Sequence, residues 1–481
     1  MTRTSGLRRA AWWAAWAALT FGLFNACLSH REAHALGREL ASGRVAFSPA
    51  VLVQAVRAAY VDDSDINRYH AYANAILGRP YQGFFIQRLD VWRRSERPRV
   101  AGTDPEDPAV VPPVVPVRAL TPYRDFSTEH LPVLFAIALP VALAADNIDV
   151  FRTIFSLVMA LLLTLALIMA ERIGRQLVPD RSGAIVRWAV VFALATGVIL
   201  VRRYDAVVPL GLCVLAWGAV TKRPVAAGLG LGLAVAAKGV PAIVVPVVLI
   251  FWLANRRPRH ALVALCAAAL LGLAFATPAV VAAGASVLDL VRYHSGRPLQ
   301  VESTWGAILV ASRAFDPASA VGDMTYSSLN VTATWDTAMR YAAVVLPFAW
   351  LAAVCGWLWT MLNRVHDDRA RGMALVAAIC VALVGWMVFG KVFSPQYLTW
   401  ILPLAVVASV ARGRGACWHL LVVLAMSQAI FPFIFAIGAP DAGRPWFGVV
   451  VLARNGLLVA WAVNLLRQPA QMDPLQALRH E

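Results

Sequence analysis

An acidic cluster, Asp62-Asp63-Ser64-Asp65, follows the first hydrophobic stretch of a chain whose other residues are largely apolar. Of the 481 residues, 60% are hydrophobic and only 15% are charged. Ionisable side chains at a membrane boundary are costly, and they indicate a functional site by default. A carboxylate there can take a proton from a hydroxyl group as a general base. Asp65 opens a helical stretch, where a carboxylate is also favoured, whereas Asp62 and Asp63 are more typical of surface or capping residues.

Cationic and polar residues in later parts of the chain suit a substrate that carries a phosphate group. Lysine and arginine neutralise phosphates and donate hydrogen bonds to them. Lys238 lies in a run of Ala, Val and Leu residues that offers it no counter-ion, which also favours a functional role. We expect substrate to be bound by Arg203, Lys238, His294, Arg297, Glu302, Lys391, Gln396, Tyr397, Glu129 and Asp125.

Purely structural roles are open for several of these residues and their neighbours. Arg202 and Arg203 could reach the membrane interface as snorkelling side chains, and Lys391 could anchor a helix end. His294 could be a solvated loop residue. Trp400 is typical of the aromatic belt at a membrane interface. The position of each side chain relative to the acidic cluster decides between these interpretations.

Long apolar runs must position these residues. Several runs approach or exceed the roughly 18 to 20 residues that cross a bilayer as a helix. The sequence therefore predicts an all-α polytopic membrane protein, one integral domain over residues 1–481, with about 11–13 transmembrane helices. A transmembrane β-barrel is excluded, because its strands are short and alternating. The runs lie at about 10–28, 131–145, 149–170, 185–201, 206–220, 225–254, 261–283, 340–361, 373–390, 397–411, 416–437 and 447–465.

Arginine and lysine residues in the short loops indicate the side of the membrane on which each loop lies, because cytoplasmic loops carry the excess positive charge. This pattern predicts a multi-pass membrane protein with an uncleaved first helix and cytoplasmic N- and C-termini. The Ala-, Arg- and Val-rich composition is typical of a bacterial protein, so the expected location is the bacterial plasma membrane. The predicted cytoplasmic loops are 172–187, 222–223, 256–259, 364–371 and 412–414.

Two large loops then face the extracytoplasmic side, 29–127 and 284–338. The first is predicted to contain an amphipathic helix at 49–60, before the acidic cluster, and a second helical stretch at 67–77 after it. A Pro- and Arg-rich segment follows at 83–121. The cytoplasmic assignment of 172–187 requires the two preceding apolar runs to cross the membrane only once between them. We therefore expect the first of them to lie at the surface or to dip in and out.

The run 225–254 lies between two basic loops, so it has to enter the membrane and return. Its middle is Lys238-Gly239-Val240-Pro241, and both glycine and proline break helices. Discontinuous helices at membrane depth usually line a binding cavity. The sequence therefore predicts two short helices that meet at a break carrying a lysine.

Composition also excludes some classes of function. The net charge of +16 comes from basic residues dispersed over loops, and they form no patch with aromatics of the kind that binds nucleic acid. The six cysteines lie singly in or beside apolar runs, which predicts no disulfide framework and no metal site.

The candidate residues lie in four short motifs. They are Ser64-Asp65-Ile66 followed by Pro122-Tyr123-Arg124-Asp125-Phe126 and Glu129, Arg203-Tyr204-Asp205 followed by Lys238-Gly239-Val240-Pro241, Tyr293-His294-Ser295-Gly296-Arg297-Pro298 followed by Glu302, and Lys391-Val392-Phe393-Ser394-Pro395-Gln396-Tyr397. In this order, over about residues 60–411, they resemble glycosyltransferase family 87 of the GT-C superfamily, the polyprenyl-phosphate-mannose-dependent mannosyltransferases of bacteria. Two departures from the family pattern are the segment 83–121 and the pair His130-Leu131.

The resemblance implies a GT-C-type glycosyltransferase that moves a sugar, expected to be mannose, from a polyprenyl-phosphate donor to a hydroxyl group of a lipid-linked or cell-envelope glycan. It implies an extracytoplasmic active site in which Asp65 is the general base and the anomeric carbon is inverted. Arg203, Lys238 and Lys391 would neutralise the donor phosphate, and no cofactor or metal is expected. Membrane lipids, the donor and the acceptor are the expected partners.

Two alternatives remain open at the level of the sequence. One is the same chemistry with another lipid-linked sugar, such as arabinofuranose. The other is a different class of protein, a transporter or lipid flippase. A transporter predicts buried charges spread through the spans and internal symmetry, whereas the candidate charges here gather on one side.

Overall fold

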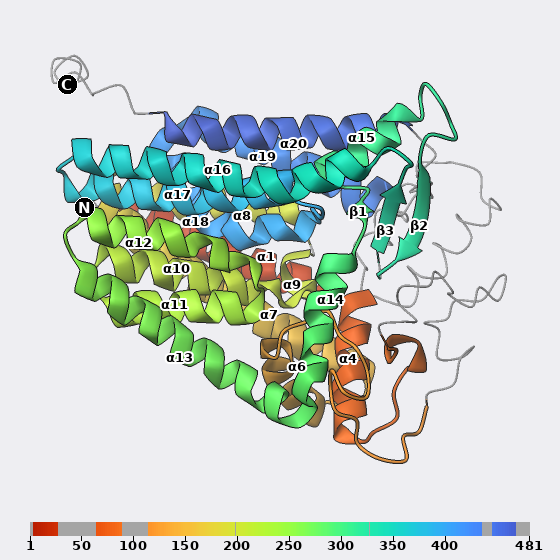
Figure 1. Ribbon diagram of the computed structural model, residues 1–481. Helices are drawn as coiled ribbons and strands as arrows, with labels where there is room; N and C mark the ends of the chain where they lie inside the picture. Colours follow the sequence, from red (N-terminus) through yellow and green to blue (C-terminus); the bar gives the residue numbers. More distant parts are fainter. Residues whose placement is uncertain are drawn as a thin grey trace.

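The computed structural model of the chain describes residues 3–26, 64–88, 114–197, 199–326, 328–434 and 445–467. Asp62, Asp63, the helix predicted at 49–60 and much of the segment 83–121 lie outside these residues. The described part is predominantly helical, and most of its helices run along a common direction in a bundle, whereas α4 and α14 run across that direction at one end (Figure 1).

Six helical segments of the described part are long and apolar enough to cross a membrane. This supports the prediction of a polytopic α-helical membrane protein, while the count of about 11–13 spans stays a prediction. The long segments are α7 (Ile148–Leu177), α13 (Pro258–Ala283) continuing into α14 (Asp289–Gly296), α16 (Thr337–Arg364), α17 (Asp368–Phe389), α19 (Arg414–Gln428) continuing to Phe431, and α20 (Pro445–Leu466).

Shorter helices fill the bundle between the long ones. Helix α6 (Val133–Leu143) has 11 residues, a length of about 16 Å. It is too short to cross the hydrocarbon core alone. That length agrees with the expectation that the run 131–145 does not make a full crossing. The other short helices are α8 (Gly183–Thr196), α9 (Ile199–Arg202), α10 (Val207–Val220), α11 (Pro224–Ala237), α12 (Val245–Ala254), α15 (Thr304–Ser312) and α18 (Leu398–Arg412). The N-terminal helix α1 (Arg3–Ala26) lies beside them.

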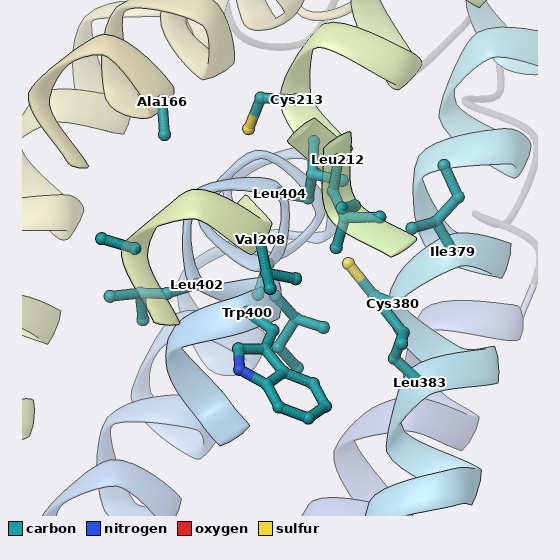
Figure 2. Packing of buried hydrophobic residues seen from close by; sticks show 14 of the residues in the cluster. Ala166, Val208, Leu212, Cys213, Ile379, Cys380, Leu383, Trp400, Leu402 and Leu404 are labelled. Atoms are coloured by element: carbon teal, nitrogen blue, oxygen red, sulfur yellow. The ribbon is translucent and has the colours of Figure 1, made fainter. Parts of the chain in front are cut away.

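The core is centred on α10, α17 and α18. Figure 2 shows Leu212 of α10 beside Leu404 of α18, with Cys380 of α17 on one side of them and Cys213 of α10 on the side of Ala166. Leu212, Cys213, Cys380 and Leu404 are all completely buried. Helices α10 and α11 pack with their backbones close together, because a Cβ atom at Gly211 would lie 2.7 Å from the carbonyl oxygen of Gly230. Small residues at helix contacts are typical of membrane bundles.

The predicted break in the run 225–254 is confirmed. Helix α11 ends at Ala237, and Lys238 has an extended backbone with φ −141° and ψ 123°. A short 3-10 helix, η4 (Val240–Val244), follows and leads into α12. Pro241 has no amide hydrogen to continue the helix, so the chain changes direction at the lysine.

A three-stranded antiparallel sheet lies at one end of the bundle, close to α14 and α4 (Ser64–Leu77) (Figure 1). Its strands, β1 (Leu299–Gln300), β2 (Val321–Thr325) and β3 (Ser328–Thr332), are arranged in the order β1-β3-β2. The predominantly helical structure is compatible with the predicted all-α class, but this small sheet was not predicted. Thr325 pairs with Ser328, and Tyr326 has φ 49°, the left-handed conformation that tight hairpins use.

Candidate functional site

The candidate residues come from distant segments of the chain that meet at the end of the bundle where α4, α14 and the sheet lie (Figure 1). Ion pairs and hydrogen bonds, given below, connect most of these segments directly. Together they make a polar cluster at the end of an apolar bundle. The segments are α4, the loop 121–132, residues 203–205, the break after α11, residues 294–302 and the link between α17 and α18.

Helix α4 places Asp65 at the cluster. Ile66, Tyr69 and Ala73 are spaced three and four residues apart and are 0% exposed, so one face of the helix is packed. Asp65 and Arg68 lie on the neighbouring face with a similar spacing. As the sequence predicted, Asp65 lies in the first turn of the helix. Its side chain keeps 15% of its surface exposed, so it stays accessible.

Asp65 belongs to a chain of ion pairs. Its carboxylate pairs directly with the guanidinium of Arg203, and Nη1 of Arg68 lies 3.9 Å from its Oδ1. Arg68 in turn pairs with Glu129. Arg202 and Arg203 are both buried, 1% and 9% exposed, so the interpretation of these residues as snorkelling side chains is wrong.

Glu129 is the most heavily bonded carboxylate in this chain of ion pairs. It accepts a hydrogen bond from the Tyr72 hydroxyl at 3.2 Å, and Nε2 of His130 also lies 3.2 Å away. Burial works against its charge, but the neighbouring Arg68 guanidinium holds the pKa of Glu129 below its usual range. Burial also lowers the pKa of His130, so at neutral pH the charge that stabilises Glu129 comes from Arg68. Glu129 therefore stays ionised and fixes the loop to α4. Nε2 of His294 lies 3.2 Å from the Glu129 carbonyl oxygen, which brings α14 to the same place.

Lys238 has a partner that its own hairpin does not supply. Its Nζ lies 3.7 Å from Oδ2 of Asp205 and 4.3 Å from the ring centre of Tyr204. Asp205 also accepts a hydrogen bond of 2.6 Å from the indole of Trp400, and Tyr397 stacks on that indole with ring centres 4.2 Å apart. Lys238 is thus not unpaired, and Trp400, 1% exposed, is not a belt residue.

Asp205→Asn is expected to destabilise the protein by about 3 kcal/mol, because removing one partner of a buried pair leaves the other charge uncompensated. The asparagine can still accept a hydrogen bond from Trp400. The loss of stability therefore comes from removing the negative charge that pairs with Lys238. The measurement is thermal unfolding in detergent. Asp205→Asn/Lys238→Met should recover much of the loss. Asp368→Asn, which weakens the exposed pair with Lys222, is the matched control and should change little.

Arg297 and Lys391 are cations with no carboxylate partner among the described residues. Nζ of Lys391 donates to the Ser295 carbonyl oxygen at 2.8 Å, and the amide of Gln300 donates to the Lys391 carbonyl oxygen at 3.0 Å. Partial burial, with Arg340 and Arg297 nearby, lowers the pKa of Lys391. The positive charges repel one another here, and an anion would relieve the repulsion. Lys391 is thus half-buried beside the last turn of α14.

Glu302 is a buried carboxyl group, 3% exposed. Burial raises its pKa to about 7, and Arg454, Arg203 and Arg297 oppose that rise. Gln300 donates a hydrogen bond of 3.1 Å to Oε2 of Glu302. At neutral pH the group therefore exists in both protonation states, so it can donate a hydrogen bond to a sugar hydroxyl or accept one from it.

The raised pKa of Glu302 predicts a pH dependence of stability. In the folded protein the group keeps its proton up to about pH 7, whereas the ordinary value is 4.5. Folding therefore gains from the protonated form below pH 4.5, and that contribution is lost as the pH rises through 7. Between pH 5 and pH 8 the wild type should lose about 3 kcal/mol more than Glu302→Gln does. Melting temperatures of both proteins over this range test the difference, and parallel curves would contradict it.

Arg454 is a residue of this site that the sequence interpretation missed. It lies in α20, is 0% exposed, donates to the Glu302 carbonyl oxygen at 3.1 Å and stacks over Phe393 at 4.0 Å. Its signal was present, since a lone arginine inside the apolar run 447–465 is costly unless it has a role. Arg454 joins the segment of Glu302 to the segment of Lys391.

Asp125 lies outside the cluster. Both of its carboxylate oxygens accept hydrogen bonds of 2.9 Å from Arg118, and the amide of Thr121 donates at 2.7 Å. Arg118 holds the pKa of Asp125 below its usual range. Its contacts are those of a turn that shapes the loop. Gln396 lies in the link at Pro395–Tyr397, where its carbonyl oxygen accepts from Thr399 at 2.7 Å.

Among the described residues, no group of three or more His, Cys, Asp or Glu side chains is placed to hold a metal ion. No known family model matches the chain, and no curated protein matches it. The proposed function therefore rests on the geometry of the cluster.

Proposed function

We propose that the protein is an inverting membrane glycosyltransferase that uses a polyprenyl-phosphate sugar, expected to be mannose, as its donor. The observation that carries the proposal is the pair of cations, Arg297 and Lys391, that have no carboxylate partner in the described part. They belong to a polar cluster that also contains carboxylates and lies at the end of an apolar bundle. A lipid phosphate needs such cations, and its hydrocarbon chain needs an apolar surface.

The proposed reaction uses Asp65 as the base. Asp65 takes the proton of an acceptor hydroxyl while the hydroxyl oxygen forms a bond to the anomeric carbon of the sugar. The bond from that carbon to the phosphate oxygen breaks, and the electron pair leaves with the phosphate. Attack from the opposite face inverts the carbon, so a β-linked donor gives an α-linked product. A single base is sufficient, because the paired phosphate is a good leaving group.

Arg203 links the base to the donor in this proposal. Its guanidinium has several N–H donors in one plane, so it can hold Asp65 and a phosphate at once. A bound phosphate would compete with Asp65 for the positive charge of Arg203 and would make the carboxylate a stronger base. The donor would thereby activate the base only when it is bound.

Glu302, His294 and Lys238 have supporting roles. Glu302 is more deeply buried than Asp65, which suits a group that orients a sugar hydroxyl. Lys238 is held by Asp205 near the same cluster, where it adds positive charge for the phosphate. His294 can position a hydroxyl of donor or acceptor from the exposed side.

A transporter or flippase is the rival class. The buried carboxylate Glu171 lies toward the C-terminal end of α7, and it pairs with Arg9 at 2.6 Å and with Arg175 at 3.1 Å. Arg454, in the middle of α20, belongs to the cluster through Glu302. The distribution of buried charge thus favours one site at one end over a pathway through the spans.

The test is transfer of label from radiolabelled polyprenyl-phosphate mannose in membranes with and without the protein. Parallel reactions contain polyprenyl-phosphate arabinofuranose, which decides the sugar. We expect label to enter a lipid-linked or glycan fraction only where the protein is present. If no lipid-linked sugar is used and the labelled lipid instead changes leaflet in a protein-dependent manner, the proposal is overturned in favour of the flippase.

A further inference from the structure

An open pocket of about 530 Å³ lies at the other end of the bundle. Its walls come from the link between α7 and α8, the first turns of α8, and the link between α18 and α19. Helix α18 begins directly after Tyr397 and ends at Arg412, and its 15 residues span about 22 Å. The pocket is therefore separate from the candidate active site.

Positive charge dominates the lining of the pocket. The lining contains three guanidinium groups, of Arg181, Arg187 and Arg414, and one carboxylate, of Asp180. Arg181 donates to the Ala411 carbonyl oxygen at 3.0 Å and so joins the link between α7 and α8 to the last turn of α18. Arg187 and Arg414 are exposed and have no ion pair within the described ranges, so their guanidinium groups are available to a ligand.

Arg187 and Arg414 lie near the N-terminal ends of two helices, where positively charged side chains are disfavoured. Arg414 is the first residue of α19, and Arg187 lies in the second turn of α8. The N-terminal end of a helix carries partial positive charge and favours anions, so cations are disfavoured there. A bound anion would satisfy the arginines and the helix ends together.

Aromatic side chains place the pocket at an interface between polar and apolar surroundings. Trp188 lines it and meets Trp418 edge-on, with ring centres 5.5 Å apart. Trp418 is 59% exposed on the outer surface of α19. Tryptophans of membrane proteins gather at the level of the lipid headgroups, and basic pockets there bind anionic headgroups.

We propose that this pocket binds a phosphate ester, held by Arg187 and Arg414 and carried by the headgroup of an anionic phospholipid. A soluble phosphate ester has the same chemistry, and the experiment separates the two sources. The site is independent of the proposed transferase reaction, because none of its residues belongs to the polar cluster.

The experiment measures lipid binding by the purified, delipidated full chain. Binding of phosphatidylglycerol, phosphatidylcholine and soluble glycerol phosphate is compared for the wild type and for Arg187→Gln/Arg414→Gln. The matched control is Arg256→Gln/Arg259→Gln, which removes the same charge from exposed arginines outside the pocket. We expect the pocket variant to bind phosphatidylglycerol roughly tenfold more weakly or worse, and the control to bind as the wild type does.

Preference for phosphatidylglycerol over phosphatidylcholine and over glycerol phosphate would assign the lipid as the source. Comparable binding of glycerol phosphate, lost in the same variant, would assign a soluble ester to the pocket. Equal binding of phosphatidylglycerol by the pocket variant and the control would overturn the proposal. Melting temperatures of both variants show that each is folded.

Discussion

Asp65→Asn is expected to lower sugar transfer by about 10²–10⁴-fold, the usual contribution of a general base. Asparagine keeps the shape of the side chain and can still accept a hydrogen bond from Arg203, but it cannot take a proton. Donor affinity should change far less than turnover, because the phosphate is held by other residues. Initial rates at saturating donor and acceptor, in membranes with matched protein levels, measure the effect.

Asp125→Asn is the matched control for this experiment. It makes the same chemical change in a carboxylate of the same region, but Asp125 is bonded to Arg118 and Thr121 in a surface turn. Transfer by this variant should stay within a few-fold of the wild type. Equal rates for Asp65→Asn and the wild type would remove Asp65 from the mechanism, and Glu302, with its pKa near neutrality, would be tested next.

Local structure at the site could be read from the sequence with some success. The helix expected at 67–77 is observed as Ser64–Leu77, with Asp65 in its first turn. The break at Lys238 was also foreseen, because Gly239 and Pro241 act on the backbone through their own covalent structure. Helices and helix breaks of this kind depend on neighbouring residues, so they can be predicted without knowing which distant segments they contact.

Partners across the fold could not be foreseen in the same way. Lys238 meets Asp205, 33 positions earlier, and Asp205 meets Trp400, 195 positions later. An apolar run shows that a lysine is costly, but it does not show which helix brings the counter-charge. The sequence alone therefore favours an interfacial role for Trp400, although its indole is hydrogen-bonded inside the protein.

The small sheet escaped prediction for a different reason. Strand β1 has only two residues, and β2 and β3 have five each, so none gives a long alternating pattern. Such strands depend on pairing with each other and on packing against α15. The sequence therefore predicts a loop over the whole segment 284–338. In the structure, β1 lies two residues before Glu302 and positions the Glu302 side chain at the cluster.

Lys391→Ala and Arg297→Ala are each expected to raise the KM for the polyprenyl-phosphate donor by about 10–100-fold, because each removes a charge-assisted hydrogen bond to the phosphate. The two residues lie in segments that contact each other, so the double variant should lose less than the product of the single losses. Both variants should fold, since neither cation forms an ion pair with a carboxylate of the described part. Donor titrations at saturating acceptor give the KM, and acceptor titrations serve as the comparison.

Lys391→Arg distinguishes a phosphate ligand from a residue that only ties two loops together. The backbone amide of Gln300 bonds to the carbonyl oxygen of residue 391, and this contact survives any side-chain change. A positive charge at the same place should restore much of the donor affinity if the phosphate binds there. Lys222→Ala, at an exposed pair with Asp368, removes a lysine without touching the cluster and should leave the donor KM unchanged. If Lys391→Ala also leaves it unchanged, the phosphate lies elsewhere in the cluster, and Arg203 with Lys238 becomes the expected pair of ligands.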